Sequence, residues 1–547
     1  MTRKRLDFWS VVKIACLVMM LLFLVYPFFS LFVKSVISPD GGLTGENFEK
    51  FFKLKYYYST LKNSLSIAVT VTLTCLALGI PMAYCMTRYN LFAKPVINAM
   101  IIMSLMSPPF IGAYSWIVLL GRNGAITNFF ARFGIETPPI YGWTGIALVF
   151  TLKLFPYVFL YVSGALRSID SSLEEASESL GSNKLRRFFS VTLPVVLPTV
   201  LSSGLMVFMT SLADFGTPML IGEGYKVLPV LIYEEYISEV GSNAGMASAL
   251  SVIIVLCSTA VLFLQNSVVA KKNYNMTALR PPETIRLRAV PRVLLTLGCF
   301  FVALLGFLPQ IVVVYSSFRK TNGPIFVDGF SLASYQDIAY KLSQNIKNTF
   351  SFSVIAIILI VIIGMLIAYL SVKRRSKSSS LLDTLVMFPY VIPGAVLGIA
   401  FLSAFNKPPM VLAGTPIILI VAYVVRKLPY TVRSTSGILY QIDSSIEEAS
   451  ISLGRSPMKT FFTVTARLMA PGVVSGAILS WISTINELSS SIMLYSGKTG
   501  TISVAVYNEV ARGGYGTAAA LASILTMVTL LSLLLFQVIS KGKVSIV

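Results

Sequence analysis

Two short acidic segments carry the residues whose types and spacing favour specific chemistry. Residues 170–177 read DSSLEEAS, and residues 443–450 read DSSIEEAS. Ser171 lies three residues before Glu174, the spacing of a capping box in which a hydroxyl and a carboxylate bind free backbone N–H groups, and the second segment repeats it. These groups suit binding rather than catalysis. We therefore expect each segment to form a short polar helix that holds a partner.

Each segment also places apolar residues on one helical face. Ile169, Leu173, Ala176 and Leu180 are spaced by four, three and four residues, and the second segment repeats this stripe. A glycine then follows, suited to ending the helix. The alternative is a capped interfacial helix on anionic lipid, for which the paired acids are unfavourable. The residues expected to dock a partner are Glu174, Glu175, Ala176, Ser177, Leu180, Gly181, Glu447, Glu448, Ala449, Ser450, Leu453 and Gly454.

The composition argues against an enzyme. The sequence contains no histidine, which removes imidazole metal sites, His-dependent triads and His proton relays. It also lacks a Gly-rich phosphate loop ending in Lys-Ser or Lys-Thr, so the chain cannot itself supply ATP hydrolysis. The acids are scattered, whereas a membrane enzyme of lipid or glycan chemistry needs them clustered. We therefore predict no catalytic residues and no metal site.

Long apolar stretches must position these segments. Hydrophobic residues make up 55% of the 547 residues and charged residues 12%, with a mean hydropathy of +0.78. Blocks of about 20 apolar residues cross a ~30 Å hydrocarbon core as helices, and alternating strands are absent. We predict an all-α polytopic membrane protein with about twelve transmembrane helices, near 11–37, 60–87, 94–120, 144–166, 190–213, 244–269, 291–318, 349–372, 381–405, 413–437, 463–485 and 516–539.

The net charge of +21 is concentrated in alternate connections between these helices. Because cytoplasmic loops are enriched in Lys and Arg, both termini are predicted to be cytoplasmic, with membrane lipid rather than nucleic acid beside the basic residues. The first apolar stretch lacks a small-residue cleavage pattern, so we expect an uncleaved first helix. The basic clusters are at residues 3–5, 186–187, 271–292, 373–377 and 541–543.

An internal repeat organises the chain. Residues 156–189 and 429–462 are identical at 18 of 34 positions without a gap, at an offset of 273 residues, and earlier helices match at an offset of 285. Six helices per half give both halves the same orientation, related by a pseudo-twofold axis along the membrane normal. The predicted domains are a first transmembrane domain (1–269, acidic helix 170–181), a cytoplasmic linker (270–291) and a second transmembrane domain (292–547, acidic helix 443–454).

The repeated segment resembles the EAA signature of ABC-importer permeases (EAA, three residues, G, nine residues, I, any residue, L, P). Residues 175–194 read EASESLGSNKLRRFFSVTLP; residues 448–467 keep the EAS and the Gly but end in Ala-Arg. The resemblance implies a type I importer fold in the bacterial cytoplasmic (inner) membrane. Each acidic helix would be a coupling helix on one of two ATP-binding subunits, which bind ATP and Mg, so this chain needs no cofactor. A periplasmic or lipid-anchored binding protein would deliver substrate for alternating access.

Two short motifs bear on the substrate. Residues 211–218 (SLADFGTP) and 486–489 (NELS) look like the ferric-iron type, in a branch that also includes permeases for thiamine and phosphonate. Asp214 and Glu487 share the 273-residue offset and end equivalent helices. Facing the pathway, they would attract a cation; the favoured alternative is that they bind loop backbone or help dock the binding protein. An ion-coupled secondary transporter would need intramembrane ionisable pairs and broken helices, and neither is evident in the sequence.

Overall fold

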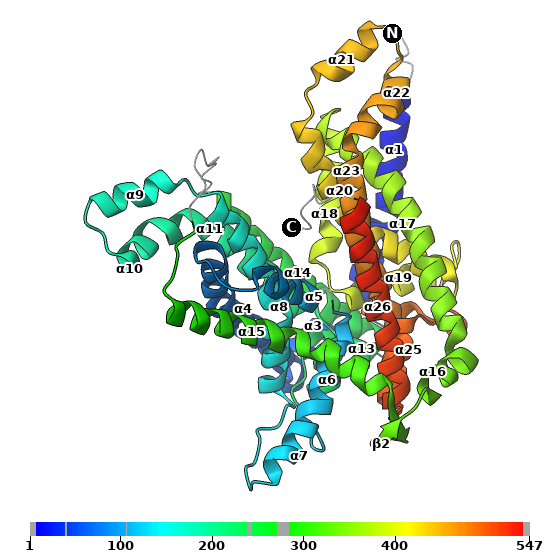
Figure 1. Cartoon of the computed structure of the whole chain (residues 1–547). Helices are drawn as coiled ribbons and strands as arrows, with labels where there is room; N and C mark the ends of the chain where they lie inside the picture. The colour runs from blue at the N-terminus through cyan, green and yellow to red at the C-terminus, as the bar shows by residue number, and fades with distance from the viewer. Residues whose placement is uncertain (1–6, 39–40, 106, 238–242, 271–283, 540–547) are drawn as a thin grey trace. The chain divides into compact units, whose positions relative to one another are not determined.

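The computed structural model describes residues 7–38, 41–105, 107–237, 243–270 and 284–539, and these ranges are largely helical (Figure 1). Helices pair their backbone groups within one segment except at their ends, as the interior of a bilayer requires. This confirms the predicted all-α polytopic class. The basic clusters at 3–5 and 541–543, and most of the predicted linker, lie outside the described residues.

The first half of the chain contains elements α1 to α14. Their bounds are α1 (Phe8–Met20), η1 (Leu21–Val25), α2 (Tyr26–Ser35), α3 (Glu46–Lys53), α4 (Lys55–Arg88), α5 (Lys94–Leu105), α6 (Pro109–Leu120), α7 (Ala125–Ala131), α8 (Trp143–Arg167), α9 (Ser171–Ser179), α10 (Lys184–Arg187), η2 (Phe188–Thr192), α11 (Leu193–Ala213), α12 (Gly216–Ile221), α13 (Leu228–Ile237) and α14 (Ala244–Ala270). The segments η1 and η2 are single π-helical turns.

The second half follows a similar order, with a short antiparallel hairpin added and with no described helix between α19 and α20 to match α7. Its elements are α15 (Ala289–Ser317), β1 (Arg319–Asn322), β2 (Ile325–Phe330), α16 (Ala333–Asp337), η3 (Ile338–Leu342), α17 (Ser343–Val372), α18 (Lys377–Val391), α19 (Gly394–Phe405), α20 (Pro416–Gln441), α21 (Ser445–Ser452), α22 (Pro457–Thr460), η4 (Phe461–Thr465), α23 (Ala466–Ile485), α24 (Ser491–Leu494), α25 (Ile502–Ala511) and α26 (Tyr515–Ile539). The segments η3 and η4 are also π-helical.

All twelve predicted transmembrane segments coincide with helices, but they are not all simple spans. Within the described residues, nine helices are long and apolar enough to cross a membrane, and a tenth span results if the bent pair α18–α19 counts as one. The predicted span at 413–437 is α20, which is long enough but carries Arg426, Lys427 and Arg433. The predicted span at 94–120 is divided into α5 and α6.

The two divided spans break at equivalent prolines. Pro108 precedes α6 and Pro393 precedes α19, and the two prolines are separated by the 285-residue offset of the repeat. The residue before a proline is disfavoured in the α conformation, and Ile392 is extended with φ −86° and ψ 131°. The axes of α18 and α19 differ by 113°. The prediction of continuous helices at 94–120 and 381–405 was therefore wrong, and both halves carry the same interruption.

Close helix packing within each half depends on a repeated glycine. A Cβ added at Gly79 on α4 would lie 2.7 Å from Val158 Cβ and 2.8 Å from its Cγ1 on α8. The equivalent Gly364 on α17 faces Thr431 on α20, at 3.0 Å from Cγ2 and 3.3 Å from Cβ. Small residues let membrane helices approach closely, and this approach supplies packing that lipid cannot. The helix pairs α4–α8 and α17–α20 are thus built on the same contact.

Replacing Gly79 with alanine should destabilise the chain by about 1–3 kcal/mol, because the new methyl group overpacks the contact with Val158. Gly364→Ala should cost less, since Thr431 leaves more room. Thermal unfolding of the chain in nanodiscs measures both. Gly437→Ala on α20 is the matched control, because nothing lies within 4 Å of its Cβ position. Equal unfolding temperatures for the Gly79 and Gly437 variants would refute this account of the packing.

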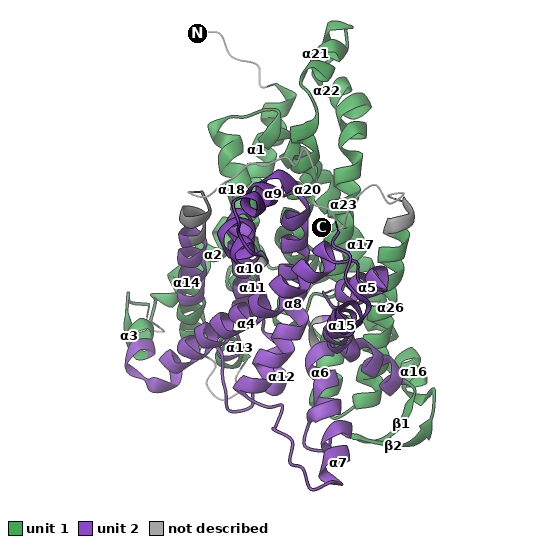
Figure 2. Cartoon of the chain, turned by 60° about the vertical axis from the view of Figure 1, so that its left-hand side comes forward, with its two compact units in different colours: residues 1–50, 232–252, 318–546 green, residues 51–231, 253–317, 547 purple. Residues whose placement is uncertain are grey.

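The described chain forms two compact units that do not follow the two sequence halves (Figure 2). One unit comprises Met1–Lys50, Ile232–Val252 and Phe318–Ile546, and the other comprises Phe51–Leu231 and Ile253–Ser317. The first helix of each sequence half therefore belongs to a unit made mainly from the other half.

Specific contacts hold each of these first helices in its unit. In the first unit, Ser30 Oγ on α2 donates to the carbonyl of Ser403 on α19 at 3.1 Å. The ring of Trp9 on α1 lies 4.5 Å from that of Tyr369 on α17. In the second unit, Ser115 Oγ on α6 donates to the carbonyl of Pro309 on α15 at 2.7 Å. Long-range side-chain contacts, and not chain proximity, thus decide where α1–α2 and α15 pack.

Candidate functional site

An aspartate binds a backbone N–H group at the start of both acidic helices: Asp170 is the N-cap of α9, and Asp443 directly precedes Ser444, the N-cap of α21. The backbone N–H of Ser172 donates to Asp170 Oδ1 at 3.0 Å, and that of Ser445 donates to Asp443 Oδ1 at 2.9 Å. The hydrogen bond from the Ser445 backbone is the main cause that lowers the pKa of Asp443 below its usual value. An ionised carboxylate at this end also faces the positive end of the helix dipole.

The capping boxes predicted from Ser171 and Ser444 are therefore wrong. Neither serine hydroxyl caps its helix. A carboxylate is the stronger acceptor for a backbone N–H, so the aspartate takes the capping role from the serine beside it. The glutamate at the third position, Glu174 or Glu447, is then released to bind elsewhere.

Both acidic helices end at a glycine in the left-handed region, as predicted. Gly181 has φ +80° and Gly454 has φ +86°. After α9, the N–H of Ser182 donates to the carbonyl of Ser177 at 3.1 Å; after α21, that of Arg455 donates to Ser450 at 3.3 Å. These bonds satisfy carbonyls that have no partner within the helix. A residue with a Cβ would be strained at either glycine.

The predicted apolar stripe divides between two environments. Ile169 precedes α9 and is buried, whereas Leu180 at the other end is 87% exposed. Its counterpart Leu453 is 85% exposed. Large apolar side chains are therefore exposed at equivalent positions of the repeat. The predicted docking residues that are exposed with them are Glu175, Ala176, Gly181, Glu448, Ala449 and Gly454.

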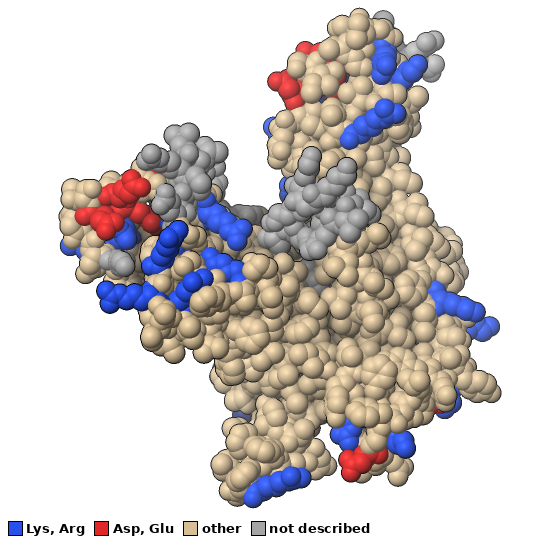
Figure 3. Space-filling model, in the orientation of Figure 1, with Lys and Arg blue, Asp and Glu red and all other residues tan. Residues whose placement is uncertain are grey.

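The other predicted docking residues lie closer to the rest of the chain. Glu174 and Glu447 are partly buried, and Ser450 is buried, with its hydroxyl 3.0 Å from that of Thr460. Figure 3 shows Asp and Glu side chains gathered over α9 and again over α21. Each acidic helix therefore presents an outer set of exposed residues and an inner set bound to its own half.

The acids at the ends of α11 and α23 are held in ion pairs. Lys153 Nζ on α8 lies 3.1 Å from Asp214 Oδ2, and the backbone N–H of Thr217 donates to Asp214 Oδ1 at 3.0 Å. This agrees with the favoured sequence interpretation, in which the carboxylate binds loop backbone. The sequence interpretation did not include Lys153 as a partner.

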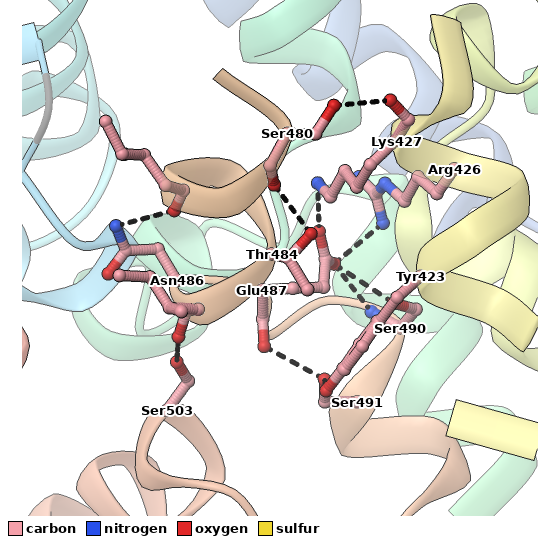
Figure 4. A network of polar contacts seen from close by, with 12 residues as sticks. Tyr423, Arg426, Lys427, Ser480, Thr484, Asn486, Glu487, Ser490, Ser491 and Ser503 are labelled. Carbon is pink, nitrogen blue, oxygen red and sulfur yellow. Dashed lines mark hydrogen bonds and ion pairs between the residues drawn. The ribbon is translucent and has the colours of Figure 1, made fainter. Parts of the chain in front are cut away.

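Glu487 has the same backbone contact and two basic partners (Figure 4). Arg426 Nη1 and Lys427 Nζ, both from α20, lie 2.9 Å and 2.5 Å from its two carboxylate oxygens. The N–H of Ser490 donates to Glu487 Oε1 at 3.1 Å. The Arg426 guanidinium also lies against Gly394, where an added Cβ would be 1.5 Å from Nη1. The ion-pair cluster thus supports the start of α19, beside the break in that span.

The register of the repeat relates the two clusters. Lys153 and Arg426 are separated by 273 residues, as are Asp214 and Glu487. This shared 273-residue offset, with a base at both 153 and 426, is the sequence signal that points to Lys153 as the partner of Asp214. Lys427 corresponds to Leu154, so the second cluster has one base more than the first. Within the described residues, His, Cys, Asp and Glu form no group of three or more that could hold a metal ion.

Comparison with known proteins identifies the family. The family model described as "Binding-protein-dependent transport system inner membrane component" matches residues 76–274 and 360–545, more than half of the chain. The chain is 28% identical to the ferric transport system permease protein FbpB of Actinobacillus pleuropneumoniae over 534 residues, which covers 96% of this chain and 77% of that protein.

A shorter relative matches only part of the chain. The molybdenum transport system permease protein ModB of Haemophilus influenzae is 32% identical over 210 residues, 37% of this chain and 90% of that protein. A crystal structure of a bacterial alginate ABC transporter with a periplasmic protein covers 48% of this chain at 15% identity and a TM-score of 0.41. The family model matches twice, at the two halves of the repeat. The chain therefore belongs to the inner membrane components of binding-protein-dependent transport systems, the permeases of ABC importers.

Proposed function

We propose that this chain is the permease of an ATP-driven importer that passes ferric iron from an external binding protein to the cytoplasm. The observation that carries the substrate is the similarity to a ferric transport permease over 96% of this chain. Thiamine and phosphonate remain the alternative cargoes of the same importer class. Ferric iron is cargo here and needs only transient contacts along the pathway.

The two acidic helices would each bind one copy of an ATP-binding subunit. Each offers an exposed leucine, Leu180 or Leu453, beside an exposed Glu-Ala pair. ATP and Mg would be bound and hydrolysed in those subunits. Closure of the ATPase dimer would draw the two helices together and open the permease outward, and hydrolysis would return it inward. Both termini would then lie in the cytoplasm, and the permease would cross the bacterial cytoplasmic membrane.

The ion pairs favour a pathway that does not select strongly for its cargo. Asp214 is neutralised by Lys153, and Glu487 is neutralised by two bases. A carboxylate already paired in a low-dielectric site has little attraction left for a passing cation. The ion pairs therefore argue against the hypothesis that Asp214 and Glu487 attract a cation. Selection would occur in the external binding protein.

Reconstituted transport tests this function. The full chain, its ATP-binding subunit and its binding protein in proteoliposomes should take up radioactive ferric iron only when ATP and Mg are present on the ATPase side. Unlabelled thiamine and 2-aminoethylphosphonate should not compete. An ATP-binding subunit with its phosphate-loop Lys replaced is the control and should abolish uptake. Uptake driven by an ion gradient without ATP would instead support a secondary transporter. Competition by thiamine would show that thiamine, and not iron, is the cargo.

A further inference from the structure

Glu174 binds back onto the membrane helices of its own half. Its Oε1 accepts hydrogen bonds from Arg88 Nη2 at 2.6 Å and from Thr192 Oγ1 at 2.9 Å. Arg88 is the last residue of α4, and its side chain is only 4% exposed. Thr192 is the last residue of η2, which leads directly into α11. One carboxylate oxygen therefore joins α9 to the adjoining ends of α4 and α11, while Glu175 beside it is exposed.

Glu447 makes the equivalent connection in the second half. Its Oε1 accepts a hydrogen bond from Thr465 Oγ1 at 2.6 Å, and its Oε2 accepts one from the Tyr369 hydroxyl at 3.3 Å. Tyr369 is buried near the end of α17, and Thr465 is the last residue of η4, ahead of α23. Glu448 beside it is exposed. The division into an inner and an outer glutamate is thus the same in both halves.

The π-helical segments strengthen the comparison. The segments η2 and η4 occupy equivalent positions, Phe188–Thr192 and Phe461–Thr465, although Pro194 has Arg467 as its counterpart. A π-helical turn is rare and occurs frequently at functional sites. In both copies the hydroxyl that reaches the inner glutamate comes from the final residue of this turn. The threonine, the turn and the glutamate therefore recur together.

We propose that Glu174 and Glu447 are positioning residues that fasten each acidic helix to two membrane helices, so that movement imposed on the acidic helix is transmitted to them. This inference rests on the proposed function, because it assigns the outer residues to ATPase docking and the inner glutamates to transmission. We call the Glu174–Thr192–Arg88 and Glu447–Thr465–Tyr369 groups the inner ties. Without its inner tie, a docked acidic helix would move without an equal movement of α11 or α23.

The two inner ties differ in chemistry. Arg88 supplies a buried charge in the first half, whereas Tyr369 supplies a neutral hydroxyl in the second. Lys373, which corresponds to Arg88 at the 285-residue offset, donates instead to the carbonyl of Ile442 at 2.6 Å. The hydrogen bonds of both ties are charge-assisted, because a carboxylate accepts them, but only the first tie adds the Coulombic attraction of an opposite charge in a partly buried site. The tie in the first half should therefore be the tighter one.

The decisive experiment removes one hydroxyl and keeps the shape of the side chain. In the assembled importer, the double variant Thr192→Val/Thr465→Val should bind the ATP-binding subunit and hydrolyse ATP as the wild type does. Its substrate uptake per ATP hydrolysed should fall about 3-fold to 10-fold, the population shift expected from losing one hydrogen bond at each tie. The double variant Thr192→Ser/Thr465→Ser keeps the hydroxyls and should restore the ratio.

Matched controls separate this effect from a general defect of the π-helical turns. Ser190→Ala and Thr463→Val remove hydroxyls from equivalent positions on η2 and η4. These hydroxyls donate to the carbonyls of Arg186 and Lys459, four residues earlier, and that of Thr463 also accepts from exposed Arg455. The two control variants should leave uptake per ATP unchanged. If the valine double variant also matches the serine double variant, the inner ties do not transmit movement and the inference is overturned.

A second readout does not depend on transport. Spin labels at Ser179→Cys and Ser452→Cys, both exposed on the acidic helices, report helix mobility in nanodiscs, in a background without the five native cysteines. Mobility should rise in the valine variant and not in the serine variant, and unchanged mobility would contradict the inner ties. Failure of ATP-dependent uptake in the wild-type importer would refute the proposed function, whereas the mobility result would still decide whether the inner ties exist.

Discussion

Replacing Glu487 with glutamine should destabilise the chain by about 3–5 kcal/mol, the usual cost of removing one partner from a buried ion pair. Glutamine keeps the size and the hydrogen-bonding groups of the side chain but removes the charge. Lys427 and Arg426, 6% and 18% exposed, then have no counter-ion in a site shielded from water. Thermal unfolding of the purified chain in nanodiscs should show a lower midpoint and a poorer folded yield.

Two further variants make this test specific. Asp214→Asn should cost less, because its pair with Lys153 is more exposed, at 12% and 16%, and leaves one base rather than two. Lys427→Leu introduces the residue type present at the equivalent position, Leu154, and leaves Glu487 paired with Arg426. Adding Lys427→Leu to Glu487→Gln should therefore recover part of the lost stability, as a double-mutant cycle would measure. No recovery, or equal losses at Asp214 and Glu487, would contradict the buried-cluster explanation.

Replacing Leu180 and Leu453 with alanine should weaken binding of the ATP-binding subunits without affecting the fold. Burial of a leucine side chain contributes about 1.5–3 kcal/mol, which corresponds to roughly tenfold to hundredfold in affinity at each site. Both leucines are more than four-fifths exposed in the isolated chain, at 87% and 85%, so truncation removes few internal contacts. Copurification of the ATP-binding subunit should fall in each single variant and be lost in the double variant.

The control for this experiment is another exposed leucine. Leu332 is 58% exposed and lies between β2 and α16, in the connection after α15. This connection is external if both termini are cytoplasmic and every predicted helix crosses the membrane. Leu332→Ala should leave copurification unchanged. If the Leu180→Ala/Leu453→Ala variant retains its ATP-binding subunits while folding normally, the acidic helices are not the docking sites.

Much of the architecture was predictable because a bilayer imposes simple rules. Long apolar blocks must be helices, and the repeat at 273 and 285 residues fixes which elements correspond. The glycine ends of α9 and α21 were predictable because only glycine adopts positive φ without strain. The breaks at Pro108 and Pro393 also had a local signal, since the residue before proline avoids the helical conformation.

Other features depend on tertiary partners that hydrophobic patterning cannot reveal. An apolar helix face can pack on lipid or on another helix, so nothing in α1–α2 predicted that it would pack with α17–α19. The capping role of Asp170 depended on competition between adjacent side chains. The bases beside Asp214 and Glu487 lie on helices that precede them by about 60 residues in sequence, 61 for Lys153 and 60 for Lys427.

One sequence argument against a secondary transporter was incorrect. It relied on the absence of intramembrane ionisable pairs and broken helices, yet the described structure contains largely buried ion pairs and interrupted helices. Lys153–Asp214 and the Glu487 cluster are such pairs, and the helix breaks before Pro108 and Pro393 are such interruptions. These features are therefore poor discriminators between the two classes of transporter. The family match over both halves of the chain supports the importer class instead.

The packing of α1–α2 with the second sequence half also constrains the order of events during synthesis. Ser30 cannot form its hydrogen bond to Ser403 until that residue, 373 positions later in the chain, has been synthesised. At ~5–20 residues per second, the ribosome needs roughly 20 to 75 seconds to deliver that partner. Throughout this interval the first helix must remain in the bilayer with lipid or an insertion factor at its packing face. A chain severed between residues 270 and 284 would hence yield two fragments that each require the other's leading helix, so that neither would be a self-sufficient folding unit.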